Sequence, residues 1–356
     1  YLREPALLVD APPEIQDLMI RLARQQGLLA RLGGDLRRQR LFEACPPRMR
    51  QQFEGAFAIS DAHARMLHWE VNRIQWAARD CNCPLILLKG AAYLLGGHEW
   101  ARERLVSDVD IMVAKDAIPC LEEALIEHGW MAVKLDEYDQ RYYRDWMHEI
   151  PPLRHSHRST EVDIHHNILP ITGRRRPDPV RMIEDAVSLS GENPRLKVLC
   201  PEDMVLHSVA HLFQDGDFHS GLRQLLDLDG MITKFSTIDR FWEHLYQRAQ
   251  VMDLIRPLYY GLLMAGCILN TSVPDSVIEK LNRIDGPNIV KRAVMIFLMK
   301  QMLIPGHPDQ SNRATAVAGW LLYLRSHWLR MPPLMLARHL WIKTRRKSLE
   351  KQQATV

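Results

Sequence analysis

Segments with the spacing of β-strands occur only in the middle of this sequence, and this restriction narrows the possible folds more than any other feature. Short apolar or alternating runs lie between residues 84 and 165, whereas apolar residues recur every three or four positions before and after them. A sheet built from the middle segments must therefore pack against helices from both flanks. This order predicts an α+β fold with a small mixed β-sheet.

The middle segments that predict strands are short, apolar or alternating, and bounded by turn residues. They are residues 84–88, 107–113, 131–135, 148–153 and 161–165. Between them we expect helices over 91–95 and 116–128, and Gly129 ends the second of these.

The flanking regions predict helices. Residues 12–32 begin with a proline pair suited to a first helical turn, and residues 60–79 begin with Ser60 or Asp61 as the N-cap. Beyond a basic, proline-punctuated linker at 173–179, helical spacing continues to the end of the chain.

We therefore divide the chain into a helical N-terminal segment (1–59), a core that contains the sheet (60–170) and an α-helical C-terminal lobe (171–356). The end of this lobe is basic, with eight Lys or Arg and one Glu between residues 325 and 351. Tryptophan and leucine residues are interspersed with these charges. We interpret the tail as helices packed on the lobe, in preference to a membrane-surface contact or a site for an anionic partner.

Composition excludes several classes of protein. The 356 residues are 47% hydrophobic and 25% charged, as in an ordinary globular protein. The longest uncharged apolar run, 258–269, is far shorter than the ~20 residues that a membrane-spanning helix needs. A net charge of +3 is small for a protein that binds nucleic acid. We expect a soluble protein that acts on a small molecule or another protein.

The six cysteines are spread along the chain in no recognisable metal-binding or disulfide pattern. Only Cys81 and Cys83 are close together, and we interpret both as free thiols. This usage favours a reducing cytoplasm.

Three aspartates could form a metal site. Asp108 and Asp110 are two residues apart on one predicted strand, so both side chains point the same way, with Cα atoms roughly 6 to 7 Å apart. Asp163 lies on another alternating strand. If the two strands are neighbours, the three carboxylates converge as hard cations such as Mg²⁺ require. The structural alternative is that Asp108 and Asp110 are solvent-facing acids on an edge strand.

Lys89 and Gly90 lie upstream, where a buried strand turns into a helix. Such a turn offers backbone N–H groups, a helix N-terminus and a cation to a phosphate chain.

The order of these motifs resembles the DNA polymerase beta-like nucleotidyltransferase superfamily. More specifically, the sequence is similar to its bacterial branch of uncharacterised nucleotidyltransferase family proteins in LLKGAA (87–92), RLVSDVDIMV (104–113), VDIH (162–165) and PEDMVLH (201–207). The resemblance covers about residues 60–235. The sequence departs from the superfamily pattern at Gly90-Ala91, where Gly-Gly or Gly-Ser is usual. A serine contact to phosphate is therefore missing, and Lys89 would substitute for it.

What the resemblance implies is nucleotidyl transfer assisted by two metal ions. Asp108 and Asp110 would hold both Mg²⁺ or Mn²⁺ ions, and Asp163 would hold the catalytic ion and help to activate the acceptor. An NTP such as ATP would be the donor. The predicted nucleotide-binding residues are Lys89, Gly90, Ala91, Arg104 and His165. For His165, a hydrogen-bonded structural role is an equally open interpretation.

By the same resemblance, the enzyme would move a nucleoside monophosphate to a hydroxyl or amine of a small molecule or protein, releasing pyrophosphate. The main alternative is a catalytically silent nucleotide-binding or regulatory protein with the same fold. Transfer to an RNA 3′ end is less favoured, because the net charge is modest and no RNA-binding module is recognisable.

Three further clusters favour structural roles. His207 and His211 have the i, i+4 spacing of zinc ligands but lack the glutamate of the H-E-x-x-H motif. Asp227 is expected to form an ion pair with Arg223 within one helix. The aromatic residues at 138–146 are expected to form a partly buried cluster on the sheet.

Overall fold

The computed structural model describes residues 2–133, 137–158, 160–189, 193–214, 218, 220–310, 312–338 and 341. The part of the predicted basic tail from residue 342 onward lies outside these residues, as do 134–136 at the end of one predicted strand.

A seven-stranded mixed sheet confirms the predicted α+β class. Its strands are β1 (Leu85–Leu87), β2 (Asp108–Met112), β3 (Trp130–Ala132), β4 (Leu153–His155), β5 (Glu161–His165), β6 (Val187–Ser188) and β7 (Leu196–Val198). The strand order is β3-β4-β5-β2-β1-β7-β6. β2 pairs in parallel with β5 and antiparallel with β1, so these three form the middle of the sheet.

The sheet differs from the prediction in two places. β4 begins at Leu153, whereas a strand was predicted over 148–153; before Leu153, the described bridge in that segment is from Glu149 to His165. β6 and β7 lie beyond residue 170 and were not predicted, although β7 pairs directly with β1. Strands of two and three residues are too short for alternation to be recognised.

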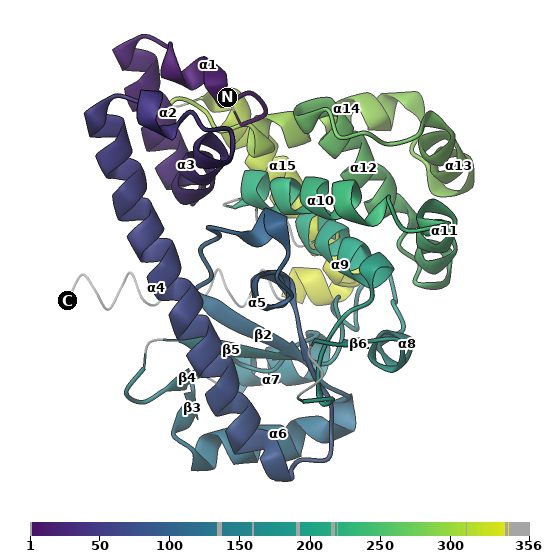
Figure 1. Cartoon of the computed structure of the whole chain (residues 1–356). Coiled ribbons are helices and arrows are strands. Elements are labelled where there is room, and N and C mark those ends of the chain that lie inside the picture. Colours follow the sequence, from purple (N-terminus) through teal and green to yellow (C-terminus); the bar gives the residue numbers. More distant parts are fainter. Residues whose placement is uncertain are drawn as a thin grey trace, which may run out of the picture.

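The helices packed around the sheet are α4 (Pro47–Ala77), α5 (Lys89–Leu95), α6 (Ile118–Glu127), α7 (Glu137–Trp146) and α8 (Pro179–Glu184). The 31-residue α4 runs from the N-terminal helices past the sheet to α6 (Figure 1). The predicted start at Ser60 or Asp61 is wrong, because Pro46 and Pro47 begin the helix and Ser60 is buried inside it. Its buried face starts at Met49, one turn after the prolines.

The N-terminal segment folds as α1 (Ala6–Val9), α2 (Pro13–Gln25) and α3 (Leu29–Arg38). The single helix predicted over 12–32 is therefore two helices. Gly27 separates them with φ +65°, a left-handed conformation that glycine adopts without strain.

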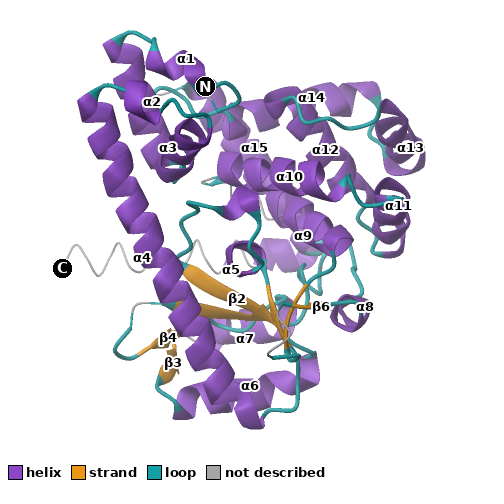
Figure 2. Ribbon diagram, in the orientation of Figure 1, coloured by secondary structure: helices purple, strands orange, loops and turns teal. Residues whose placement is uncertain are grey.

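The C-terminal part of the described chain consists of helices stacked above the sheet (Figure 2). They are α9 (Pro201–Gln214), α10 (Gly221–Phe235), α11 (Phe241–Val251), α12 (Ile255–Leu269), α13 (Asp275–Asp285), α14 (Ile289–Leu303) and α15 (Arg313–Arg330). The apolar run at 258–269 is the interior of α12, which packs against α9, α10 and α13. None of the helices in the described ranges is long and apolar enough to cross a membrane.

Short 3₁₀ turns connect several of these elements. They are η1 (Phe42–Ala44), η2 (Ala78–Asp80), η3 (Glu99–Ala101) and η4 (Lys115–Ala117). Within the predicted aromatic cluster, the rings of Tyr142 and Trp146 in α7 make an edge-to-face contact, with centroids 5.9 Å apart.

A disulfide joins Cys81, just after α4, to Cys120 in α6. The interpretation of Cys81 as a free thiol is therefore wrong, whereas Cys83 is free and buried. Thirty-nine residues separate the bonded pair, and the Cα atoms come within 6.0 Å only because α4 and α6 pack together.

A buried ion pair fastens α4 to the connection between β4 and β5. Glu70 is fully buried, and Nε and Nη2 of Arg158 donate to its two oxygens at 2.9 and 3.2 Å. The same guanidinium lies 4.7 Å from the ring centroid of Trp130. This pair holds the long helix in place beside the sheet.

Arg158→Ala is expected to lower the free energy of unfolding by about 3–5 kcal/mol, because it leaves a buried carboxylate without its partner. The control is Arg141→Ala, which breaks an exposed pair with Asp145 on α7 and should cost less than about 1 kcal/mol. Urea denaturation of both variants measures the difference. Equal losses would contradict the role given to Arg158.

Candidate functional site

The pairing of β2 with β5 brings the three predicted aspartates together. Because the strands are parallel and in register, Asp110 lies opposite Asp163, and Asp108 points to the same face two residues earlier. One carboxylate oxygen from each residue lies within 4.8 Å of the other two. The edge-strand alternative is excluded, because β2 lies between β1 and β5.

Asp163 has the environment of a metal ligand. Its Oδ1 is buried and has no hydrogen-bond partner among the described residues. Burial raises the pKa of the Asp163 carboxyl to about 7, and the neighbouring Asp110 and Glu149 carboxylates add to the rise. An unpartnered oxygen in a three-carboxylate set fits a hard divalent cation such as Mg²⁺.

Asp110 is held by two side chains. Its Oδ1 accepts a hydrogen bond from Nζ of Lys89 at 2.6 Å and another from Nε2 of His165 at 2.9 Å. Burial alone would raise the pKa of the Asp110 carboxyl, but these two groups outweigh burial and hold the pKa well below its ordinary value. Asp110 is therefore ionised and fixed in orientation.

Lys89 and Gly90 are the first two residues of α5 and follow β1 after Leu88, so the chain passes from strand to helix where the sequence predicted it. Lys89 has φ +47°, an uncommon conformation for a residue with a side chain, and this conformation is a local strain of the kind found at functional sites. Burial opposes the charge on Lys89, but the Asp110 carboxylate raises the pKa of its ammonium above the ordinary value.

Arg104 packs directly against Gly90. A Cβ at Gly90 would lie 2.1 Å from Nη1 of Arg104, so only glycine leaves room for the guanidinium. Nε of Arg104 donates to Oδ2 of Asp227 on α10 at 3.0 Å, and the two side chains are only 11% and 3% exposed. The predicted pairing of Asp227 with Arg223 is therefore wrong, because Asp227 forms its ion pair with the core instead.

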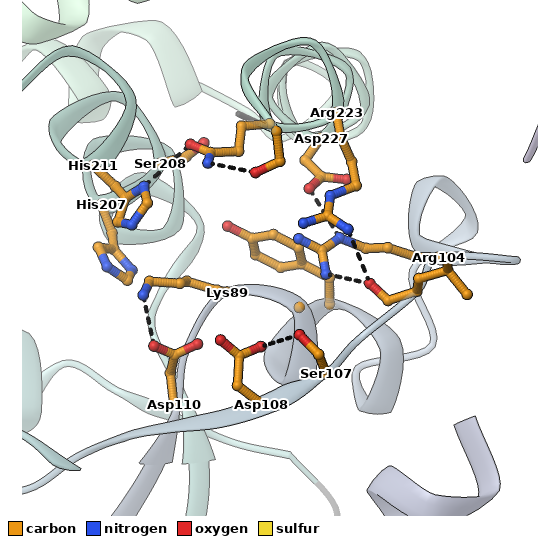
Figure 3. A pocket seen from close by; sticks show the side chains of 15 residues that line it. Lys89, Arg104, Ser107, Asp108, Asp110, His207, Ser208, His211, Arg223 and Asp227 are labelled. Atoms are coloured by element: carbon orange, nitrogen blue, oxygen red, sulfur yellow. Dashed lines mark hydrogen bonds and ion pairs between the residues drawn. The ribbon is translucent and has the colours of Figure 1, made fainter. Parts of the chain in front are cut away.

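A cavity opens between the sheet and the helices above it (Figure 3). The core side carries Lys89, Gly90, Tyr93, Arg104, Leu105, Ser107, Asp108 and Asp110, and the helical side carries His207, Ser208, His211, Ser220, Arg223, Gln224 and Asp227. The carboxylates of Asp108 and Asp110 thus lie at the floor of the cavity, and the cationic side chains of Lys89, Arg104 and Arg223 lie around it. Such a cavity has ligands for metal ions and partners for a polyanion.

Arg223 is the cation that sequence reasoning assigned only a structural role. Burial and the nearby Arg104 lower the pKa of its guanidinium, which stays charged at neutral pH. Its Nε is buried without a hydrogen-bond partner in the described part of the chain. An anion in the cavity would satisfy both the charge and the unused donor.

The remaining predicted residues lie behind the cavity wall. Ala91 and His165 are each about 1% exposed and, with Asp163, are absent from the described cavity lining. His165 contacts Asp110, so its observed position supports the structural interpretation. On the helical side, Nδ1 of His211 pairs with Oε1 of Gln224 at 3.1 Å.

A comparison with known protein families finds one to which this chain is similar. A family model described as uncharacterised nucleotidyltransferase matches residues 12–270, which include the sheet and both helices that line the cavity. Neither the curated proteins nor the solved structures contain a match.

Gly90→Ala is expected to destabilise the protein by about 1–3 kcal/mol, because the added methyl group must push Arg104 away from Asp227. Gly55→Ala is the matched control: a Cβ there meets no described atom within 4 Å, and alanine favours the helix by about 0.5–1 kcal/mol. Urea denaturation should thus give changes of opposite sign. A neutral Gly90→Ala would contradict the close approach.

Asp163→Asn is expected to stabilise the metal-free protein. The folded state raises the pKa of Asp163 from 3.8 to about 7, so folding binds a proton, and stability falls as the pH rises between these values. Asparagine does not titrate, so the variant avoids this loss. The expected gain in the free energy of unfolding above pH 7 is at most about 4 kcal/mol, since one pKa unit corresponds to about 1.4 kcal/mol. Thermal denaturation in chelator at pH 5 and pH 8 tests the sign. A gain at pH 8 no larger than at pH 5 would contradict it.

Proposed function

We propose a function on the basis of the family: the chain belongs to the uncharacterised nucleotidyltransferases. In this proposal the protein binds an NTP in its cavity and transfers the nucleoside monophosphate to an acceptor hydroxyl or amine, releasing pyrophosphate. The observation that carries the proposal is that Asp108 and Asp110, which converge with Asp163, line one cavity together with the cationic side chains of Lys89, Arg104 and Arg223. A metal–triphosphate complex requires both.

In this proposal Asp108, Asp110 and Asp163 hold Mg²⁺ or Mn²⁺. Two such ions, when bound, lower the pKa of an acceptor hydroxyl and neutralise charge on the reacting phosphates. The protein contributes rigid placement, because the strand pairing fixes the carboxylates before any ligand arrives. The motif order also supports placing the chain in the polymerase beta-like superfamily.

The cationic side chains bind the phosphates. Arg104 is oriented by Asp227, and Nη1 of Arg223 donates to the Leu105 carbonyl at 3.4 Å, so both guanidiniums are placed before the anion binds. Lys89 offsets the charge of Asp110 in the metal-free protein. If Asp110 held a divalent cation, the Lys89 ammonium would be free to neutralise the triphosphate.

His165 acts through Asp110 and does not contact the nucleotide. Its ring lies beneath the carboxylate and is almost completely buried. We therefore assign it as a positioning residue.

A thermal-shift titration with each of the four NTPs, with and without Mg²⁺, tests the proposal without a known acceptor. One NTP should raise the melting temperature of the wild type only when Mg²⁺ is present, because binding to the folded state stabilises it. Asp108→Asn should abolish this shift, and Arg223→Ala should reduce it. Arg240→Ala changes an exposed arginine outside the cavity and should leave the shift intact.

Pyrophosphate release with a panel of hydroxyl and amine acceptors completes the test. Asp108→Asn should lower the rate by at least about 100-fold, because even indirect supports of a metal ligand contribute 10–100-fold. Nucleotide binding without turnover for any acceptor would favour the catalytically silent alternative. No shift with any NTP, in folded protein, would overturn nucleotide binding at this cavity.

A further inference from the structure

A second group of metal-binding side chains lies beside the aspartates, on the far side of Asp110 from the cavity. Ligand atoms of His148, Glu149 and His165 all lie within 4.8 Å of one another. Both imidazoles are buried, whereas the Glu149 side chain is 22% exposed. Nucleotidyl transfer as proposed above uses none of the three to contact substrate.

Backbone hydrogen bonds hold this group in place. Glu149 forms a β-bridge with His165 at the end of β5. On either side of that bridge, the Ile150 N–H donates to the Ile164 carbonyl at 3.0 Å and the His166 N–H donates to the His148 carbonyl at 2.8 Å. The donors therefore come from two adjacent extended segments, which fix their separation as a sheet does.

The contact with Asp110 determines which nitrogen of His165 is available. A carboxylate oxygen only accepts hydrogen bonds, so Nε2 carries the proton that it donates to Asp110 at 2.9 Å. In the neutral ring Nδ1 carries a lone pair; it is buried, has no hydrogen-bond partner among the described residues and faces Oε2 of Glu149 at 3.4 Å. Burial opposes a charge on His165, but the contacts with Asp110 and Glu149 raise the pKa of its imidazole, so a metal ion at Nδ1 takes the place of a proton. Histidine ligands commonly donate their other nitrogen to a carboxylate in this way, which orients the ring toward a metal.

The spacing of the donors suits a small transition-metal ion. Ligand atoms at about 2.0–2.1 Å from Zn²⁺ in a tetrahedron lie about 3.3 Å apart. Oε2 of Glu149 lies 3.4 Å from Nδ1 of His165 and 3.9 Å from Nε2 of His148. All the donor atoms lie within 4.8 Å of one another, so movements of at most about 1.5 Å would close the site around an ion, with a fourth position left for water.

Charge and ligand chemistry separate this group from the aspartates. Two imidazoles and one carboxylate favour Zn²⁺ and related transition metals, whereas three carboxylates favour Mg²⁺ or Mn²⁺. The charged groups that face Asp163 here are the carboxylates of Asp110 and Glu149, the ammonium of Lys89 and the imidazole of His165.

We propose that His148, Glu149 and His165 bind a transition-metal ion of the Zn²⁺ type, and that the hydrogen bond from His165 to Asp110 joins this ion to the aspartate site. Its occupancy fixes the ring that orients Asp110. The assignment does not depend on transfer activity.

Zinc titration of the chelator-stripped full chain, in competition with a chromophoric chelator and with Mg²⁺ in large excess, tests the proposal. The excess Mg²⁺ occupies the carboxylate set, so the wild type should bind one Zn²⁺ with high affinity. Glu149→Gln and His148→Gln should each weaken binding by at least about 100-fold, more than the loss of an indirect support. Asp108→Asn and His157→Gln, which changes an exposed histidine, should bind as the wild type does.

Two further measurements keep the test decisive. Zn²⁺ should raise the melting temperature of the wild type and not that of Glu149→Gln, a partly exposed position at which the fold tolerates an amide. Co²⁺ should give the intense visible absorption of a four-coordinate nitrogen and oxygen site only when His148 is present. Absence of high-affinity Zn²⁺ binding, or binding that survives both substitutions, would overturn the assignment. Either result leaves the NTP titration unaffected, so the two proposals fail separately.

Discussion

The floor of the cavity depends on the partly buried ammonium group of Lys89. Asp108, Asp110 and Asp163 lie together on neighbouring strands, and like charges at this distance repel strongly in a poorly solvated environment. Lys89 offsets the most buried of them through a 2.6 Å ion pair with Asp110. The left-handed backbone at Lys89 is the cost of placing that ammonium where β1 turns into α5. The fold thus keeps a cation among its carboxylates even in the absence of a metal ion.

The cavity joins parts of the chain that are far apart in sequence. The carboxylates come from the sheet, whereas Arg223 and Asp227 come from α10. The buried pair of Arg104 and Asp227 crosses between these parts, so the helices are aligned on the sheet by an interaction inside the cavity itself. Truncating either partner would both misplace the helices and expose a buried charge.

The sequence predicted those features of the site that follow from local geometry. The i, i+2 spacing fixes Asp108 and Asp110 on one face of a strand, and Gly90 after a buried strand marks the turn. It did not predict the partner of Asp227, because the i, i+4 neighbour Arg223 is the obvious local choice and Arg104 is 123 residues away. The Cys81–Cys120 disulfide and the cavity-facing role of Arg223 also depend on tertiary packing, which no local spacing records. The predicted start of α4 at Ser60 or Asp61 follows the preference for a polar N-cap, whereas the helix begins at Pro47 after Pro46 with no side-chain cap among the described contacts.

Because β2 and β5 pair in register, the carboxylate site depends on the length of both strands. β2 and β5 pair at five positions, and at one of them Asp110 lies opposite Asp163. A slip of one residue would bring Val162 or Ile164 opposite Asp110 and turn the Asp163 carboxylate to the other face of the sheet. The site is therefore sensitive to a single inserted residue within either strand. Insertions at exposed turns of the connection between them, which contains α6 and α7, leave that pairing untouched. Two chains of this design with very different connections would share the same arrangement of carboxylates.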